Sequence, residues 1–137
     1  MVVVDQIKDL EKRLAALYLH LEIQNKIDFL KSEKLKTEHP EFWNDSTKAQ
    51  IIIKSIKKEQ NWVDHYHKVN TAIQDLLILY EFFLGKEVSE LEIKKNFDET
   101  KELLEDLEFK NMLSKDEDSM PAVVIINPGA GGTESQD

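Results

Sequence analysis

The longest regular hydrophobic pattern in the chain lies between Asp45 and Gly85, a stretch that contains neither Gly nor Pro. Its apolar side chains alternate between spacings of three and four residues, and Glu59 and Asn70 fill the two positions where an apolar residue is missing. The apolar positions are Ala49, Ile52, Ile56, Val63, Tyr66, Ile73, Leu77, Tyr80 and Leu84. This heptad pattern predicts one continuous helix from about Ser46 to Leu84, roughly 58 Å long, which Gly85 is expected to end.

The segment before Pro40 has two apolar seams in place of one. The second seam is displaced by two residues from the first, and neither Gly nor Pro lies at the shift. The first seam consists of Ile7, Leu10, Leu14, Leu17 and Leu21, and the second of Ile23, Ile27 and Leu30. We therefore expect either a bent helix or two abutting helices between Asp5 and about Thr37. In the connection that follows, Phe42 and Trp43 are expected to anchor the turn against the helices, and a stacking platform for nucleic acid is the alternative.

A third helix is predicted to begin at Ser89, which forms a capping box with Glu92. Its apolar seam consists of Ile93, Phe97, Leu104 and Leu107, and its end is expected at Phe109, Met112 and Leu113. Short connections make neighbouring helices antiparallel. Residues 1–113 are therefore predicted to form an all-α domain, an antiparallel three-helix bundle of coiled-coil character.

The last residues differ in composition from the helical part. We interpret residues 114–120 as an acidic linker, and Ala122 to Ile126 as a short β-branched strand. The turn from Gly129 to Gly132 holds three of the four glycines, and Thr133 with Gln136 forms a capping box for one further turn of helix. A strand, a turn and a single helical turn cannot bury a core, so residues 121–137 are expected to be the start of a truncated α/β domain.

Composition limits the class of protein. The 137 residues include no Cys, which excludes disulfides and cysteine-based zinc or thiol chemistry. The longest apolar stretch, Leu76 to Leu84, is far shorter than the roughly 20 residues that a membrane-spanning helix needs. The segment Met1 to Val4 is too short for a secretory signal. We therefore expect a soluble, cytoplasmic protein without a membrane partner.

The net charge of −9 argues against direct nucleic-acid binding by this chain alone, because phosphate binding needs clustered Lys and Arg. The acidic excess is uneven, since Glu87 to Ser119 contains 12 Asp and Glu against 5 Lys. Such a face favours a basic protein surface as partner, and a solvated helix face without a partner is the alternative.

No group of residues has the pattern of a catalytic, cofactor-binding or metal site. His65 and His67 are two residues apart, which points them to different faces of a helix, whereas a metal pair would be four apart. The glycine turn before Thr133 could attract phosphate, but it lacks the Gly-Lys-Ser/Thr ending of a P-loop, and Glu134 would repel an anion. We therefore predict no catalytic, cofactor-binding or metal-binding residue, no cofactor and no enzymatic activity.

Three segments resemble the bacterial class-I translation termination factors, in particular the release factor 2 family. The residues Gly129 to Asp137 match the family's Gly-x-Gly-Gly-Thr-Glu-Ala-Gln-Asp, with Ser135 in the Ala position. Leu107-Glu108-Phe109-Lys110 is similar to the family's Leu-Glu-Phe-Arg/Lys segment, and Pro40 to Asn44 to its Pro-x-x-Trp-Asn segment. The resemblance covers essentially the whole chain, and its Thr-Glu ending with Trp43 favours release factor 2 over release factor 1.

The resemblance implies that the chain is the amino-terminal, ribosome-docking part of a factor that recognises UGA and UAA codons and triggers peptidyl-tRNA hydrolysis. It implies two partners, the GTPase-associated region of the large ribosomal subunit and, functionally, release factor 3. The family's catalytic Gly-Gly-Gln and its codon-reading tripeptide lie further along, and Gly131-Gly132-Thr133 is neither, so this chain alone is expected to be inactive in release. The alternatives are an independent helical coiled-coil adaptor, with Ile73 and Leu77 in a dimer seam, and, more distantly, a nucleotide-dependent enzyme.

Overall fold

The computed structural model of the chain describes residues 2–119, and their side chains as far as Lys115. Within that range the chain forms α1 (Val4–His20), α2 (Ile23–Thr37), the 3-10 helix η1 (Pro40–Asn44), α3 (Ser46–Leu84) and α4 (Glu90–Ser119). The all-α prediction is confirmed for these residues, and the predicted strand and glycine turn lie outside them. The chain divides into two compact units, Met1–Leu107 and Glu108–Asp137.

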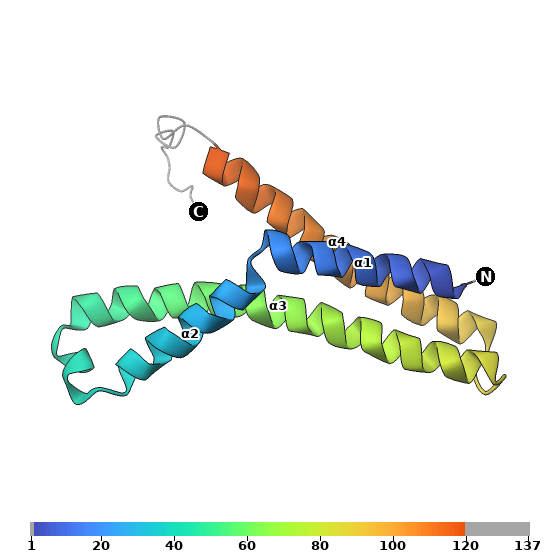
Figure 1. Ribbon diagram of the computed structural model, residues 1–137, viewed down its shortest axis with the longest axis horizontal. Helices are drawn as coiled ribbons and strands as arrows, with labels where there is room; N and C mark the ends of the chain where they lie inside the picture. The colour runs from blue at the N-terminus through green and yellow to red at the C-terminus, as the bar shows by residue number, and fades with distance from the viewer. Residues whose placement is uncertain (1, 120–137) are drawn as a thin grey trace. The chain divides into compact units, whose positions relative to one another are not determined.

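In the first unit α3 is the common partner of the other helices. Figure 1 shows α1 and α2 running one after the other along α3, which returns in the opposite direction, and α4 reversing again after a short turn. The predicted antiparallel course is therefore present, but two helices, α1 and α2, occupy the place of the first predicted one. Among the described residues no helix is both long and apolar enough to cross a membrane.

The break between α1 and α2 distinguishes the two alternatives that the displaced seams left open. Glu22 adopts a left-handed backbone conformation with φ 52° and ψ 49°, so the segment consists of two abutting helices. Leu21 and Ile23 are both buried, at 6% and 0% exposure. In one continuous helix these side chains would lie about 200° apart around the axis. The left-handed residue between them lets both face the same core.

The longest helix has the predicted bounds, Ser46 to Leu84. It begins at Asp45, whose Oδ1 accepts the Lys48 N–H at 3.0 Å. At its end the N–H groups of Lys86 and Glu87 donate to the carbonyl groups of Phe83 and Phe82. These two hydrogen bonds form a Schellman motif, in which the left-handed residue is usually Gly. Here Lys86 is left-handed with φ 63°, whereas Gly85 has φ −81°.

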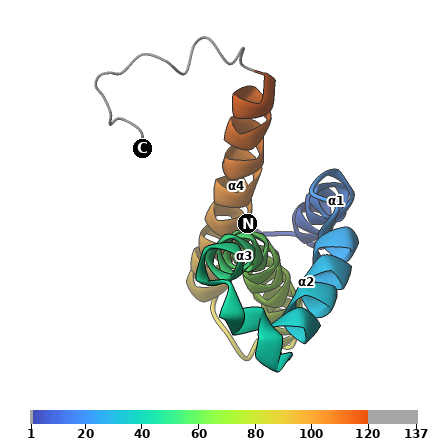
Figure 2. The same ribbon diagram turned by 90° about the vertical axis from the view of Figure 1, so that its left-hand side faces the viewer.

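The predicted apolar seam of α3 holds for its first half and shifts in its second. Val69, Ile73 and Leu76 are each 0% exposed, whereas the predicted seam residue Leu84 is 62% exposed. On a straight helix with 3.6 residues per turn a heptad seam drifts by about 20° per heptad, so Leu84, five heptads after Ala49, lies about 100° away from it around the axis. The covering helix also changes, because α2 covers the first half of α3 and α1 covers the second, from a different direction (Figures 1 and 2). The seam predicted at Leu84 is therefore wrong.

The main core lies where α3 is covered by α1, the start of α2 and α4. Its buried members are Val2, Ile7, Leu10, Leu14, Leu17, Leu21, Ile23, Val69, Ile73, Leu76, Ile93, Phe97, Leu104 and Leu107. Towards the other end of α3 the buried apolar residues are fewer, namely Leu30, Ala49 and Val63. The part formed by α2, η1 and the first half of α3 therefore stands on a much thinner core.

The last helix begins as predicted but ends later. The Ser89 Oγ accepts the Glu92 N–H at 3.1 Å, and α4 then continues to Ser119. The prediction that it ends near Leu113, before an acidic linker at 114–120, is therefore wrong for the backbone of Ser114–Ser119. No Gly or Pro occurs between Glu90 and Ser119 to stop the helix. The division of the chain into functional domains stays a prediction.

Candidate docking surface

The end of the molecule at which α2, η1 and α3 meet carries the candidate docking surface, which we call the tip and define as residues 34–53. In η1 successive side chains point about 120° apart, because a 3-10 helix has three residues per turn. Phe42 consequently turns inward and lines an open pocket of about 520 Å³ together with Lys36, Ala49 and Ile52. Trp43 turns outward. Its ring contacts the Phe42 ring edge to face, with 4.8 Å between the ring centroids.

The prediction that Trp43 anchors this turn is therefore wrong. Its side chain is 57% exposed, and the residues Leu35 and Ile51 on the neighbouring helices are 62% and 64% exposed. Single exposed apolar residues are common on protein surfaces, but four large ones within the tip, with Ile53 at 39% exposure as the fourth, mark a candidate interaction surface. Periodicity could not reveal this surface, because η1 is too short to show a helical repeat.

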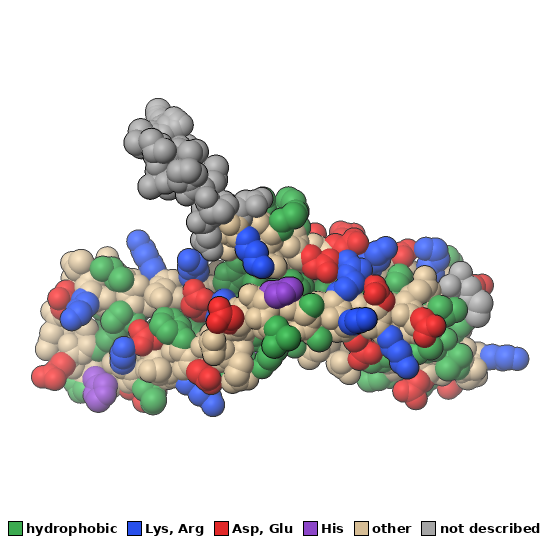
Figure 3. Space-filling view, turned by 45° about the horizontal axis from the view of Figure 1, so that its top comes forward, with side chains coloured by type: hydrophobic (Ala, Val, Ile, Leu, Met, Phe, Trp, Pro, Cys, Tyr) green, Lys and Arg blue, Asp and Glu red, His purple; other side chains and the backbone are tan. Residues whose placement is uncertain are grey.

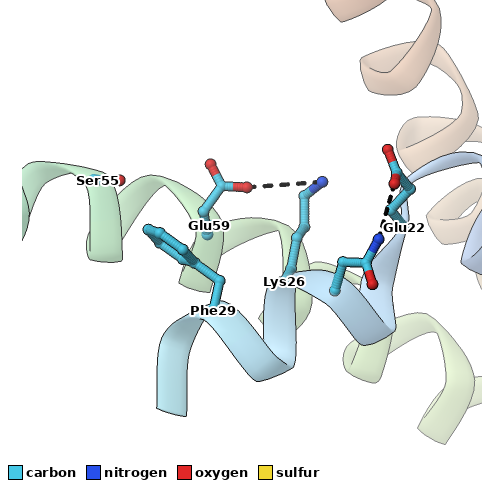
Figure 4. A pocket seen from close by; sticks show the side chains of 6 residues that line it. Glu22, Lys26, Phe29, Ser55 and Glu59 are labelled. Carbon is cyan, nitrogen blue, oxygen red and sulfur yellow. Dashed lines mark hydrogen bonds and ion pairs between the residues drawn. The ribbon is translucent and has the colours of Figure 1, made fainter. Parts of the chain in front are cut away.

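A polar groove behind the tip fixes α2 against α3. It is an open pocket of about 320 Å³ lined by Glu22, Asn25, Lys26, Phe29, Ser55 and Glu59. Figure 4 shows Lys26 reaching from α2 towards Glu59 of α3, at an Nζ to Oε1 distance of 3.7 Å. These two side chains are only 20% and 22% exposed, and Lys26 also donates to the Leu21 carbonyl group. One ammonium group thus joins the end of α1 to both helices that carry the tip.

The histidines of α3 do not form a chemical centre. His67 is exposed and contacts the Tyr66 ring at 5.6 Å, and His65 is half-buried on another side of the helix. The described residues contain no group of three or more His, Cys, Asp or Glu side chains able to hold a metal ion. The two histidines are therefore not brought together by the fold.

Two tyrosines, Tyr18 of α1 and Tyr66 of α3, contact each other near the break between α1 and α2. The ring centroids of Tyr18 and Tyr66 lie 5.4 Å apart, and the Tyr18 hydroxyl donates a hydrogen bond to Gln24 Oε1 at 2.8 Å. Burial, with a smaller contribution from the Tyr18 phenol, raises the pKa of Tyr66 above its ordinary value. The two rings thus pack α1 against α3 beside the break between α1 and α2.

Charge on the surface is mixed. Lys and Arg side chains are interspersed with Asp and Glu side chains along the face shown in Figure 3. Several of them pair within one helix, as Lys94 does with Asp98 at 2.9 Å and Lys36 with Glu33 at 2.7 Å. Exposed pairs of this kind contribute little to stability. Recognition by charge would therefore depend on individual grooves and not on the net charge of the chain.

Comparison with known proteins finds relatives of this chain among the peptide chain release factors. A family model described as PCRF domain matches residues 23–137. The chain is 35% identical over 136 residues to peptide chain release factor 2 of Nautilia profundicola, covering 85% of this chain and 36% of that protein. It is 43% identical over 101 residues to peptide chain release factor 2 of Campylobacter fetus subsp. fetus, covering 72% of this chain and 27% of that protein.

A third relative, peptide chain release factor 2 of Acidovorax sp. strain JS42, is 33% identical over 133 residues, which are 96% of this chain and 36% of that protein. The chain thus spans about a third of the length of the curated relatives that it matches. These matches confirm the resemblance to release factor 2 inferred from the glycine-rich tail and from Trp43. Because the family model matches most of its residues, the chain belongs to the PCRF domain family.

Proposed function

We propose that the chain acts as the amino-terminal, ribosome-docking part of a peptide chain release factor 2. The observation that carries this proposal is the match of residues 23–137 to the PCRF domain, together with release factor 2 relatives at 33–43% identity. In this proposal the whole protein recognises UGA and UAA codons in the cytoplasm and triggers hydrolysis of peptidyl-tRNA. The present residues contribute binding and no catalytic group.

The docking partner in this proposal is the GTPase-associated region of the large ribosomal subunit, and release factor 3 is a functional partner. The tip supplies a physical basis, since Leu35, Trp43 and Ile51 offer exposed apolar area at one end of the helices. Exposed Trp residues are frequent anchors at protein interfaces because a large rigid ring is buried at little entropic cost. The clamp of Lys26 on Glu59 would hold α2 and α3 in the geometry that presents this end.

The test is competition on a ribosomal termination complex. The chain is expected to release no peptide by itself and to compete with a full-length factor of the same class. Trp43→Ala should weaken the competition by about tenfold, which corresponds to about 1.4 kcal/mol, a usual loss for a truncated interface Trp. Leu19→Ala is the matched control, because Leu19 is 72% exposed on α1 and lies outside the tip.

Two results would contradict the proposal. Stop-codon-dependent release of peptide by the chain itself would show a catalytic activity that the proposal denies. Failure to compete at any concentration would remove the docking role. Equal weakening by Trp43→Ala and Leu19→Ala would leave the docking role standing but place the contact away from the tip.

A further inference from the structure

The contact line between α2 and α3 has a groove on each side, and the two grooves differ in charge. The groove of Figure 4 takes Glu22, Lys26 and Phe29 from α2, and two carboxylates, Glu22 and Glu59, line it. The second groove takes Lys31 and Lys34 from α2, on the side of that helix roughly opposite to Glu22 and Lys26. The two grooves share no lining residue.

The polar groups that line the second groove are Lys31, Lys34, Gln60 and His67, over a floor that includes the buried Leu30 and Val63. No carboxylate lines it. The Lys34 Nζ donates to Gln60 Oε1 at 2.9 Å, and Gln60 Nε2 donates to Asp64 Oδ1 at 2.8 Å. The Asp64 carboxylate thus accepts a hydrogen bond from the Gln60 amide. The side chains of Lys31 and Lys34 are both exposed. This arrangement keeps two positive charges available at the mouth of the groove.

The local charge supports the same inference. From Lys31 to Lys58 the sequence contains seven Lys against four Asp and Glu, so this part is net positive although the whole chain carries −9. The acidic excess belongs to the residues after Glu87. Interactions between exposed charges are largely screened beyond about 8–10 Å at ordinary salt. The potential in the groove therefore depends mainly on the nearby charges, Lys31, Lys34 and the Asp64 carboxylate that Gln60 holds, and the net charge of the chain is a poor guide to it.

We propose that this second groove binds the phosphate backbone of RNA, through Lys31 and Lys34. The pocket is about 230 Å³ and open, below the roughly 300–1,000 Å³ of sites that enclose small molecules, so it suits a contact along a chain better than capture of a free ligand. Lys is a point-charge partner for phosphate, and Gln60 and His67 add hydrogen-bonding groups beside it. The choice of RNA rests on the proposed function, because the ribosome is a polyanion of RNA.

The experiment measures binding of the chain to a short fluorescein-labelled RNA hairpin by anisotropy, at several salt concentrations. Two neutralised phosphates predict that affinity falls about tenfold between about 50 and 200 mM salt. The variant K31Q/K34Q should bind at least about tenfold more weakly at low salt and lose most of the salt dependence. The charge-retaining variant K31R/K34R should bind like the unchanged chain, and circular dichroism verifies that each variant keeps its helices.

The matched control is K54Q/K58Q, which removes the same charge from two exposed lysines of α3 that do not line the groove. Its affinity should stay within about threefold of the unchanged chain. Equal weakening by the two double variants would reduce the effect to general attraction and overturn the proposal. So would the absence of RNA binding at low salt, or equally tight binding of polyglutamate, which carries carboxylates and no phosphate.

The ribosome competition assay separates this inference from the proposed function. If RNA binding fails while the chain still competes on ribosomes, the groove assignment is wrong and the docking role stands. If RNA binding depends on Lys31 and Lys34 while competition fails, the groove assignment stands without the docking role.

Discussion

Three leucines in the second half of α3 provide a direct test of how this helix is packed. Leu76 is 0% exposed, Leu77 is partly buried against the same core, and Leu84 is 62% exposed. The substitution Leu→Ala is chemically identical at each position, so differences in the free energy of unfolding report the environment alone. The heptad seam in the sequence contains Leu77 and Leu84 and excludes Leu76, so it predicts the reverse order of effects.

The magnitudes follow from burial. Removing a fully buried Leu side chain loses its transfer free energy and leaves a cavity, which together cost about 2–5 kcal/mol. Leu76→Ala should therefore lower the free energy of unfolding by about 3 kcal/mol. Leu77→Ala should cost about 1–2 kcal/mol, because part of its surface is already in water. Leu84→Ala should change stability by no more than about 0.5 kcal/mol, as usual for exposed positions.

The assay is urea unfolding followed by circular dichroism and by tryptophan fluorescence, whose agreement tests whether one transition is present. The slope against urea must stay constant across the series for the midpoints to be compared. A larger loss for Leu77→Ala than for Leu76→Ala, or a loss above about 1.5 kcal/mol for Leu84→Ala, would refute the packing described for α3. Measurements at two protein concentrations also test the coiled-coil adaptor, because the midpoint of an obligate dimer depends on concentration.

The remaining predictions concern the end of α3 and the tyrosine pair. Gly85→Ala should stabilise the chain by about 0.4–1 kcal/mol in the same assay, because Gly85 has φ −81° and an added Cβ meets its nearest atom at an ordinary 3.5 Å; destabilisation would mean that Gly85, and not Lys86, is the left-handed residue. Tyr66 has a raised pKa, so its contribution to stability is fully present below its ordinary value of about 10 and declines as the pH rises above it. Tyr66→Phe should therefore make the loss of stability above about pH 10 shallower, and an unchanged pH profile would contradict the burial of that phenol.

The sequence predicted best those features that depend on neighbouring residues. The bounds of α3 follow from caps and from a stretch without Gly or Pro, and its start and end agree with the structure at Ser46 and Leu84. The displaced seams at Leu21 and Ile23 predicted a change of helix direction, but they did not distinguish a bent helix from two separate helices. The left-handed conformation of Glu22 separates the segment into two helices, and nothing in the sequence around Glu22 predicts that conformation.

Features that depend on partners distant in the sequence were missed. The buried side of α3 shifts partly because the covering helix changes from α2 to α1, and a pattern along one helix contains no record of that change. The outward position of Trp43 was missed for another reason, because η1 is too short for its tight winding to appear as a repeat in the sequence. The carboxylate-free groove appears only when Lys31 and Lys34 of α2 are placed beside Gln60 of α3.

The uneven core along α3 gives this single helix two different local stabilities. Its second half is held by most of the buried side chains, whereas its first half shares with α2 only Leu30, Ala49 and Val63. Local opening costs less free energy where fewer apolar contacts must be broken. The end that carries Trp43 therefore opens at a lower free energy than the half of α3 that packs against α1 and α4.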